Sequence, residues 1–135
     1  MQTMMIGQVA RESGIGVETV RFYEREGLLD QPARRASGYR EYTPAALSRL
    51  RFIKQAQRLG FTLREIKELL ALKLDPHSTR AQVRKQTELK IADIDQRIRE
   101  LKRMKKALGP LVRACDGAGA LEGCPILAAI EKHCP

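Results

Sequence analysis

The sequence predicts a mainly α-helical protein: a winged helix-turn-helix, a helical connector, a long coiled-coil helix and a short C-terminal loop and helix. Two short helical segments joined by a Gly-containing turn precede a basic hairpin. Apolar residues then recur at helical spacing, and the stretch 79–108 contains neither Pro nor Gly. The predicted divisions are 4–73 for the winged unit, 79–108 for the coiled coil, and 109–135 for the loop and last helix.

The composition fits a folded, basic protein. The chain has 135 residues, of which 43% are hydrophobic, and a net charge of +9 that is divided between residues 1–74 (+5) and 75–135 (+4). An excess of basic charge favours a polyanionic partner such as DNA, although a basic soluble protein would look similar. No apolar run is long enough to span a membrane and no secretion signal precedes the first helix, so we expect a cytoplasmic protein without membrane contact.

The predicted helix-turn-helix covers about residues 7–26. A first helix ends near Gly14, Ile15 and Gly16 form the turn, and Val17 begins the second helix. In the second helix Arg21 faces outward, whereas the spacing leaves open whether Tyr23 or Phe22 faces the core together with Val20. Helix-turn-helix proteins place such a second helix in the major groove of DNA.

The predicted wing covers about residues 34–42, with the sequence RRASGYREY. Arginines flank the Ser37-Gly38 turn, and Arg side chains bind phosphates in bidentate fashion. Taken alone, the segment could equally be an ordinary surface hairpin. Beside a helix-turn-helix, it predicts a second DNA contact.

The connector is predicted to contain two core-forming helices. Thr43-Pro44 combines a typical N-cap with a proline at the first helical position. Thr62 and Glu65 form a capping-box sequence before the next helix, which Asp75-Pro76 ends.

The stretch 79–108 predicts a coiled-coil dimerisation helix. A helix of this length is too long for a small domain to cover, so we expect a second copy of it as partner, parallel or antiparallel. Packing back on its own domain is the alternative. The predicted seam consists of Thr87, Ile91, Ile94, Ile98, Leu101, Met104 and Leu108.

All three cysteines lie near the C-terminus. Gly109-Pro110 is predicted to end the long helix, a Gly- and Ala-rich loop joins Cys115 to Cys124, and Pro125 begins a short amphipathic helix. An odd number of cysteines without a secretion signal argues against a disulfide framework. Their clustering predicts a site.

Together these segments resemble the MerR family of transcription regulators over essentially the whole chain. The resemblance rests on GQVARESGIGVETVRFYEREGLL, the wing SGYREY, RLGFTLREIKELLAL, the long helix and the Cys-x8-Cys-Pro loop. It is greatest to the heavy-metal branch, and within that branch to the copper-efflux regulators.

The resemblance implies a homodimer with an antiparallel coiled coil that binds a near-palindromic promoter site. In the family, binding of the inducer makes the dimer distort promoter DNA so that RNA polymerase can use it. By position, the family's DNA contacts fall on Arg21, Tyr23, Arg34, Tyr39 and Arg40.

The resemblance also implies that Cys115 and Cys124 are metal ligands. Two soft thiolates suit Cu(I), Ag(I), Au(I) or Hg(II), which accept linear coordination, whereas zinc prefers four ligands. Relatives that bind divalent ions add a cysteine near the start of the long helix, where this chain has Arg80. A guanidinium there would offset the negative charge of a monovalent dithiolate complex, unless Arg80 points to solvent. We therefore expect Cu(I), or Ag(I) or Au(I), as the cofactor.

Alternatives remain at the sequence level. If His133 and Cys134 also ligate, Zn(II), Cd(II) or Pb(II) fits as well; otherwise they belong to a C-terminal tail. A disulfide between Cys115 and Cys124 would make the same fold a redox sensor. An enzyme has little support, because no nucleophile lies beside a base in the sequence pattern.

Overall fold

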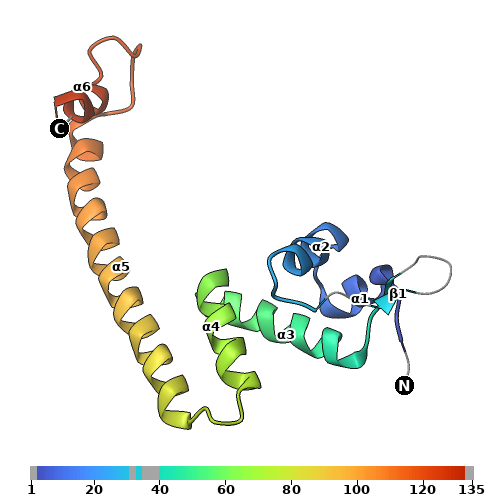
Figure 1. Ribbon diagram of the computed structural model, residues 1–135. Helices are drawn as coiled ribbons and strands as arrows, with labels where there is room; N and C mark the ends of the chain where they lie inside the picture. Colours follow the sequence, from blue (N-terminus) through green and yellow to red (C-terminus); the bar gives the residue numbers. More distant parts are fainter. Residues whose placement is uncertain (1–2, 31–32, 35–39, 133–135) are drawn as a thin grey trace. The chain divides into compact units, whose positions relative to one another are not determined.

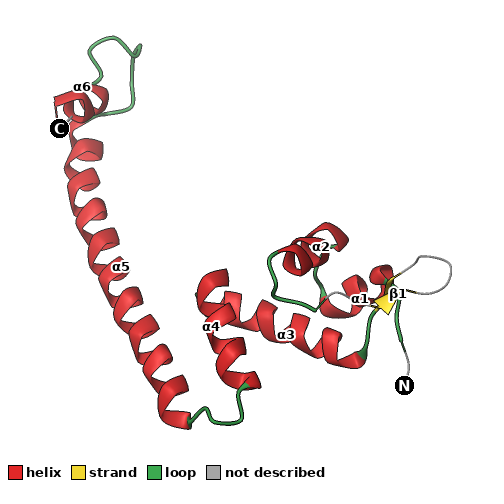
Figure 2. Cartoon of the chain, in the orientation of Figure 1, coloured by secondary structure: helices red, strands yellow, loops and turns green. Residues whose placement is uncertain are grey.

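The computed structural model describes residues 3–30, 33–34 and 40–132, with only the backbone of 33–34. It divides into two compact units, Met1–Gln86 and Thr87–Pro135. Helices dominate both (Figures 1 and 2), which confirms the predicted fold class. The elements are α1 (Ile6–Ser13), α2 (Val17–Arg25), β1 (Ala33–Arg34), β2 (Arg40–Glu41), α3 (Pro44–Arg58), α4 (Leu63–Leu74), α5 (Arg80–Ala114) and α6 (Pro125–Lys132).

The helix-turn-helix forms as predicted. Helix α1 ends at Gly14, whose φ of 72° is a left-handed conformation that glycine adopts without strain. The Gly14 carbonyl accepts a hydrogen bond from Lys54 Nζ of α3 at 2.9 Å. A Cβ at position 14 would lie 2.3 Å from that nitrogen. The backbone conformation therefore favours glycine at this turn, and a larger residue would also displace the end of the Lys54 side chain.

One hydrophobic core holds the first unit together. Helix α1 packs against α2 and α3, and α3 packs against α4. Burial of each large apolar side chain contributes about 1.5–3 kcal/mol. The most deeply buried side chains are Val9, Val20, Leu28, Tyr42, Leu50, Ile53 and Ile66.

The wing is a short antiparallel ladder. Ala33 pairs with Glu41 and Arg34 pairs with Arg40. Beyond the ladder, Met4 and Tyr42 exchange two backbone hydrogen bonds of 2.8 and 2.7 Å. The chain segment before α1 is thus joined to the segment after β2.

Both predicted caps of the connector are present. The Thr43 side chain accepts a hydrogen bond from the Ala46 N–H at 3.3 Å. Thr62 and Glu65 form the full capping box, with hydrogen bonds of 3.2 and 2.8 Å. These local contacts fix where α3 and α4 begin.

Helix α5 is longer than predicted. It has 35 residues and continues to Ala114, so the predicted end at 108 before Gly109-Pro110 is wrong. Proline removes one N–H and crowds the preceding turn, but it leaves the other hydrogen bonds of the helix in place. Gly109 lies within the helix and has no positive φ. The helix therefore passes through both residues, and the loop begins at Cys115.

The predicted seam of α5 is largely exposed in the single chain. Ile91, Ile98 and Leu101 are 54%, 44% and 63% exposed. Helix α6 likewise exposes Leu127 and Ile130. Among the described residues, no helix combines the length and apolar character needed to cross a membrane.

Candidate functional site

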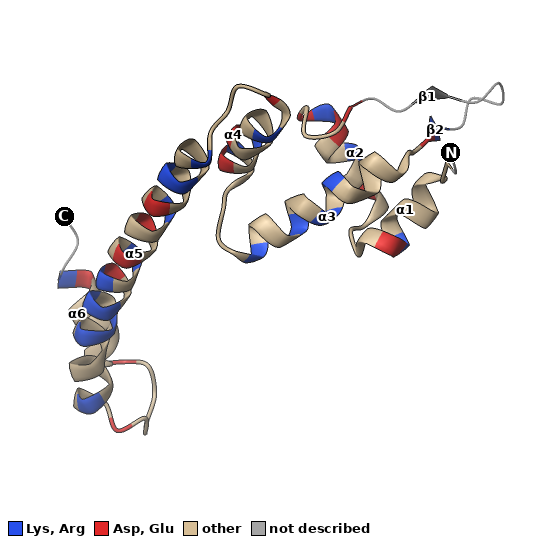
Figure 3. Cartoon of the chain, turned by 90° about the horizontal axis from the view of Figure 1, so that it is seen from below, with Lys and Arg blue, Asp and Glu red and all other residues tan. Residues whose placement is uncertain are grey.

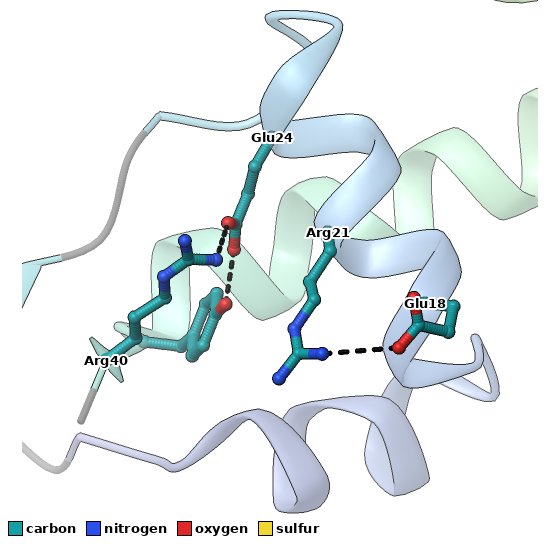
Figure 4. Close-up of polar contacts among 5 residues, drawn as sticks. Glu18, Arg21, Glu24 and Arg40 are labelled. Atoms are coloured by element: carbon teal, nitrogen blue, oxygen red, sulfur yellow. Dashed lines mark hydrogen bonds and ion pairs between the residues drawn. The ribbon is translucent and has the colours of Figure 1, made fainter.

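Arg21 lies on the exposed side of α2, the second helix of the helix-turn-helix. Its Nη1 is 3.2 Å from Glu18 Oε1, and the two side chains are 47% and 84% exposed (Figure 4). An ion pair this exposed contributes little to stability, about 0–1 kcal/mol. Arg21 is therefore exposed, and its partner is one that it can exchange at little cost.

Tyr23 does not lie on the exposed face. It is 3% exposed, and its hydroxyl donates a 3.0 Å hydrogen bond to Gln57 Oε1 of α3. Burial raises the pKa of Tyr23, and the bond to Gln57 lowers it in part. The Tyr23 ring is therefore part of the core that holds α2 on α3, and the DNA contact predicted at this residue would need its hydroxyl to leave Gln57.

Glu24 was missed by the sequence reasoning and is the most connected polar residue of α2. Its side chain is 2% exposed, and Oε2 lies 2.5 Å from Arg40 Nη1. Tyr42 donates a short hydrogen bond to Oε1 of the same carboxylate. The available sequence indication was that Glu24 follows the buried Val20 by four residues, which places a carboxylate on the apolar face of the helix.

The structure describes the three predicted wing residues to different extents. Arg40 lies in β2 with its side chain 29% exposed, and one of its N–H groups already binds Glu24. Arg34 lies opposite Arg40 in the ladder. Tyr39 lies outside the described residues. Since Arg has five N–H donors, the bond to Glu24 uses only part of the hydrogen-bonding capacity of Arg40.

Cys115 and Cys124 lie at the two ends of the loop between α5 and α6. Cys115 directly follows α5, and its N–H donates to the Val112 carbonyl at 3.2 Å. Cys124 directly precedes α6, and its carbonyl accepts from the Ala128 N–H at 3.1 Å. Each cysteine is therefore fixed to the end of a helix, although the loop between them is irregular.

Local contacts shape that loop. The Asp116 carboxylate accepts a hydrogen bond from the Ala118 N–H at 3.0 Å. Gly117, Gly119 and Gly123 have φ values of 79°, 95° and 78°, which side-chain-bearing residues rarely adopt.

Both cysteines line one open hollow of about 570 Å³, whose walls are the loop and the adjoining residues. Within 115–124 they are the two residues that are not fully exposed, and both are free thiols. No group of three or more His, Cys, Asp or Glu side chains suited to a metal forms in the described part of the chain. The donor set that the structure provides here is two thiols.

Of the other predicted site residues, the structure describes only Arg80, and Arg80 does not line this hollow. Cys134 and His133 lie outside the described residues. Arg80 is exposed and is the first residue of α5, whereas Cys115 follows the last one. They lie at opposite ends of a 35-residue helix, about 50 Å long.

Charge is unevenly distributed along α5 (Figure 3). Its acidic residues end at Glu100, and every charged residue after it in the helix is basic. These basic residues are Lys102, Arg103, Lys105, Lys106 and Arg113.

Comparison with known proteins agrees with these observations. The family model "MerR HTH family regulatory protein" matches residues 4–73, and the model "MerR, DNA binding" matches residues 47–111. The mercuric resistance operon regulatory protein of Serratia marcescens is 39% identical over 131 residues, 97% of this chain and 90% of that protein. The transcriptional regulator CueR of Escherichia coli O6:H1 is also 39% identical over 131 residues, 97% of this chain and 96% of CueR.

A solved structure is similar over nearly the same length. The transcription regulator PbrR691 from Ralstonia metallidurans CH34, determined in complex with lead(II), superposes with a TM-score of 0.81 and 37% identity. The match covers 94% of this chain and 99% of that one. The similar proteins thus include a mercuric resistance operon regulator, the regulator CueR and a regulator whose structure was determined with lead(II). The chain belongs to the MerR family of helix-turn-helix regulatory proteins.

Proposed function

We propose that the protein is a metal-responsive transcription regulator that binds promoter DNA as a homodimer and activates transcription when a thiophilic metal ion binds Cys115 and Cys124. The observation that carries the proposal is the pair of half-buried thiols lining one hollow in the loop after α5. Family membership, with relatives that regulate metal resistance, supports it.

The exposed seam of α5 supports a second copy of the chain as its partner. Leaving Ile98, Leu101 and Met104 in water is unfavourable, and burying them against an identical seam removes that cost. The charge pattern favours an antiparallel pair. That arrangement places the basic C-terminal half of one helix beside the partner's region that contains Glu88, Asp93 and Asp95, whereas a parallel pair would place like charges together.

The dimer would present two DNA-binding units, one from each chain. Arg21 of α2 would enter the major groove, and Arg34, Tyr39 and Arg40 of the wing would bind the phosphate backbone. The long helices would fix the distance between the two units. A change at the loop that follows each long helix could then alter this distance, and with it the shape of the bound promoter that RNA polymerase must recognise.

Two thiolates with no further ligand suit a soft ion that accepts linear coordination, and we propose Cu(I), Ag(I) or Au(I). The metal would supply the bond that joins the ends of α5 and α6. Hg(II) also accepts two thiolates. Zn(II), Cd(II) and Pb(II) would need further donors, from Cys134 and His133 or from a second chain.

The test is in vitro transcription from a promoter that the purified, reduced protein binds. The protein is titrated separately with Cu(I), Ag(I), Hg(II), Pb(II) and Zn(II). We expect activation by Cu(I) and Ag(I) at lower free metal than by any divalent ion. Activation by Zn(II) or Pb(II) alone would overturn the choice of metal, and no activation by any metal would overturn metal sensing.

A thiol redox sensor is the second candidate, since the two free thiols share one hollow. In that case an oxidant without metal would activate transcription, and the protein would contain a Cys115–Cys124 disulfide detectable by mass spectrometry.

A further inference from the structure

Glu24 connects the recognition helix to the wing. It projects from α2, while its two donors, Arg40 and Tyr42, come from β2 and the residue that follows it (Figure 4). Both contacts span 16 or more positions of the sequence. They join the two parts of the unit that the proposed function assigns to different surfaces of DNA.

The burial of Glu24 makes these contacts necessary. A carboxylate whose side chain is 2% exposed has lost most of its hydration, so each oxygen must be satisfied within the protein. Arg40 satisfies Oε2 and Tyr42 satisfies Oε1. Because Tyr42 is 1% exposed and its backbone is also paired with Met4, the base of the wing is anchored on both sides.

Arg40 is held differently from Arg21. The partner of Arg21 is an exposed carboxylate on the same helix, whereas the partner of Arg40 is buried on another element. A guanidinium with one N–H fixed on a buried carboxylate has a restricted orientation, and its remaining donors point away from that carboxylate. Because the Arg40 side chain is 29% exposed, a phosphate can reach its guanidinium.

We propose that Glu24 is a positioning residue for DNA binding: it fixes Arg40 and the base of the wing against the recognition helix, so that the wing arginine is oriented for a backbone phosphate before DNA binds. The inference rests on the proposed function, since it assigns a role within DNA binding.

If Glu24 positions Arg40, neutralising Glu24 should weaken DNA binding, whereas electrostatics alone predicts stronger binding. Removing a negative charge near DNA should strengthen binding, because the remaining basic charge increases. Loss of the positioning contact should weaken it. Glu24→Gln is therefore compared with Glu26→Gln, which removes the same charge from an exposed residue at the end of α2.

The DNA is a duplex selected by the full-length wild-type protein from a random-sequence pool, and Kd is measured by fluorescence anisotropy at several salt concentrations. We expect Glu24→Gln to weaken binding by about tenfold or more, corresponding to loss of one charge-assisted contact. Glu26→Gln should bind as tightly as wild type or slightly tighter. The slope of log K against log salt should fall by about one phosphate contact in Glu24→Gln.

The same two substitutions in an Arg40→Gln background separate positioning from general damage to the fold. Without Arg40 the wing arginine that Glu24 orients is absent, although Tyr42 can still donate to position 24, and the double variant contains no unpaired charged partner. Glu24→Gln and Glu26→Gln should then have the same small effect. This comparison stays informative even if Glu24→Gln alone folds poorly, which thermal unfolding monitored by circular dichroism would reveal.

Two results would overturn the inference: Glu24→Gln binding as tightly as Glu26→Gln in the wild-type background, or weakening binding equally in both backgrounds. If the wild-type protein selects no duplex at all, the proposed function itself fails.

Discussion

Cys115 directly follows the last residue of α5 and Cys124 directly precedes the first residue of α6, so the two thiols of one hollow are attached to two helix ends. A bond through a metal between them would therefore constrain the position of α6 on the helix that sets the dimer geometry. The attachment of the two cysteines to helix ends thus offers a way for metal binding in the loop to affect the long helix.

Replacing either cysteine by serine should abolish the metal response and leave DNA binding intact. Loss of a ligand should lower metal affinity by more than the roughly 10–100-fold that changes around metal ligands usually cost. The check is transcription together with DNA anisotropy for Cys115→Ser and Cys124→Ser. Cys134→Ser is the matched control; loss of the response in that variant would show that the tail contributes a ligand.

A charge in the seam of α5 should dissociate the dimer. Ile98 is 44% exposed in the single chain and lies at the centre of the predicted seam, so Ile98→Lys would bury an unpaired ammonium in the interface. Analytical ultracentrifugation should show a monomer. Gln96→Lys, on the exposed surface outside the seam, should remain dimeric. A dimeric Ile98→Lys would place the interface elsewhere.

Truncation in the N-terminal core should lower stability. Leu50 of α3 is 0% exposed, and removing a fully buried leucine side chain typically costs about 2–5 kcal/mol. Thermal unfolding of Leu50→Ala should therefore begin at a clearly lower temperature than that of wild type. Leu59→Ala is the control, because Leu59 is 68% exposed and its loss should have little effect. Equal destabilisation by both would be inconsistent with the core described.

Tyr42 should remain protonated to unusually high pH. Its burial, and then its hydrogen bond and proximity to Glu24, raise the pKa of Tyr42 to about 12 from the ordinary 10.0. Between these values the unfolded chain has lost the proton while the folded protein keeps it, so the free energy of unfolding falls as pH rises through this range. The total loss is on the order of 2 kcal/mol.

Absorbance titration at 295 nm measures this directly. Wild type should show a phenol that titrates near 12, and Tyr42→Phe should lack it. Tyr42→Phe should also have a smaller loss of stability between pH 10 and 12. A wild-type titration in which all tyrosines ionise near 10 would contradict the buried contact with Glu24.

Features set by neighbouring residues could be predicted from the sequence. Thr43-Pro44 and Thr62 with Glu65 determine helix starts through contacts within four residues, and both caps formed as expected. The clustering of the three cysteines likewise predicted a site, and the resemblance to the MerR family implied Cys115 and Cys124 as the pair within it. In these cases the contacts that determine the structure join residues that are close together in the sequence.

Features set by distant residues could not be predicted in the same way. The apolar spacing of α2 left Tyr23 and Phe22 as alternatives for the core, and the contact with Gln57 of α3 places Tyr23 there. Glu24 became important only because Arg40 and Tyr42 come to it from the wing. Pro110 suggested a helix end, yet a helix that keeps its other hydrogen bonds continues past it.

The most direct test of the central claim is X-ray absorption spectroscopy of the full-length protein loaded with one equivalent of Cu(I) under reductant. We expect copper to be bound by two sulfur ligands in wild type, and the Cys115→Ser/Cys124→Ser double variant not to retain it. Copper with three or four ligands, or copper retained by the double variant, would contradict a site made of these two thiolates.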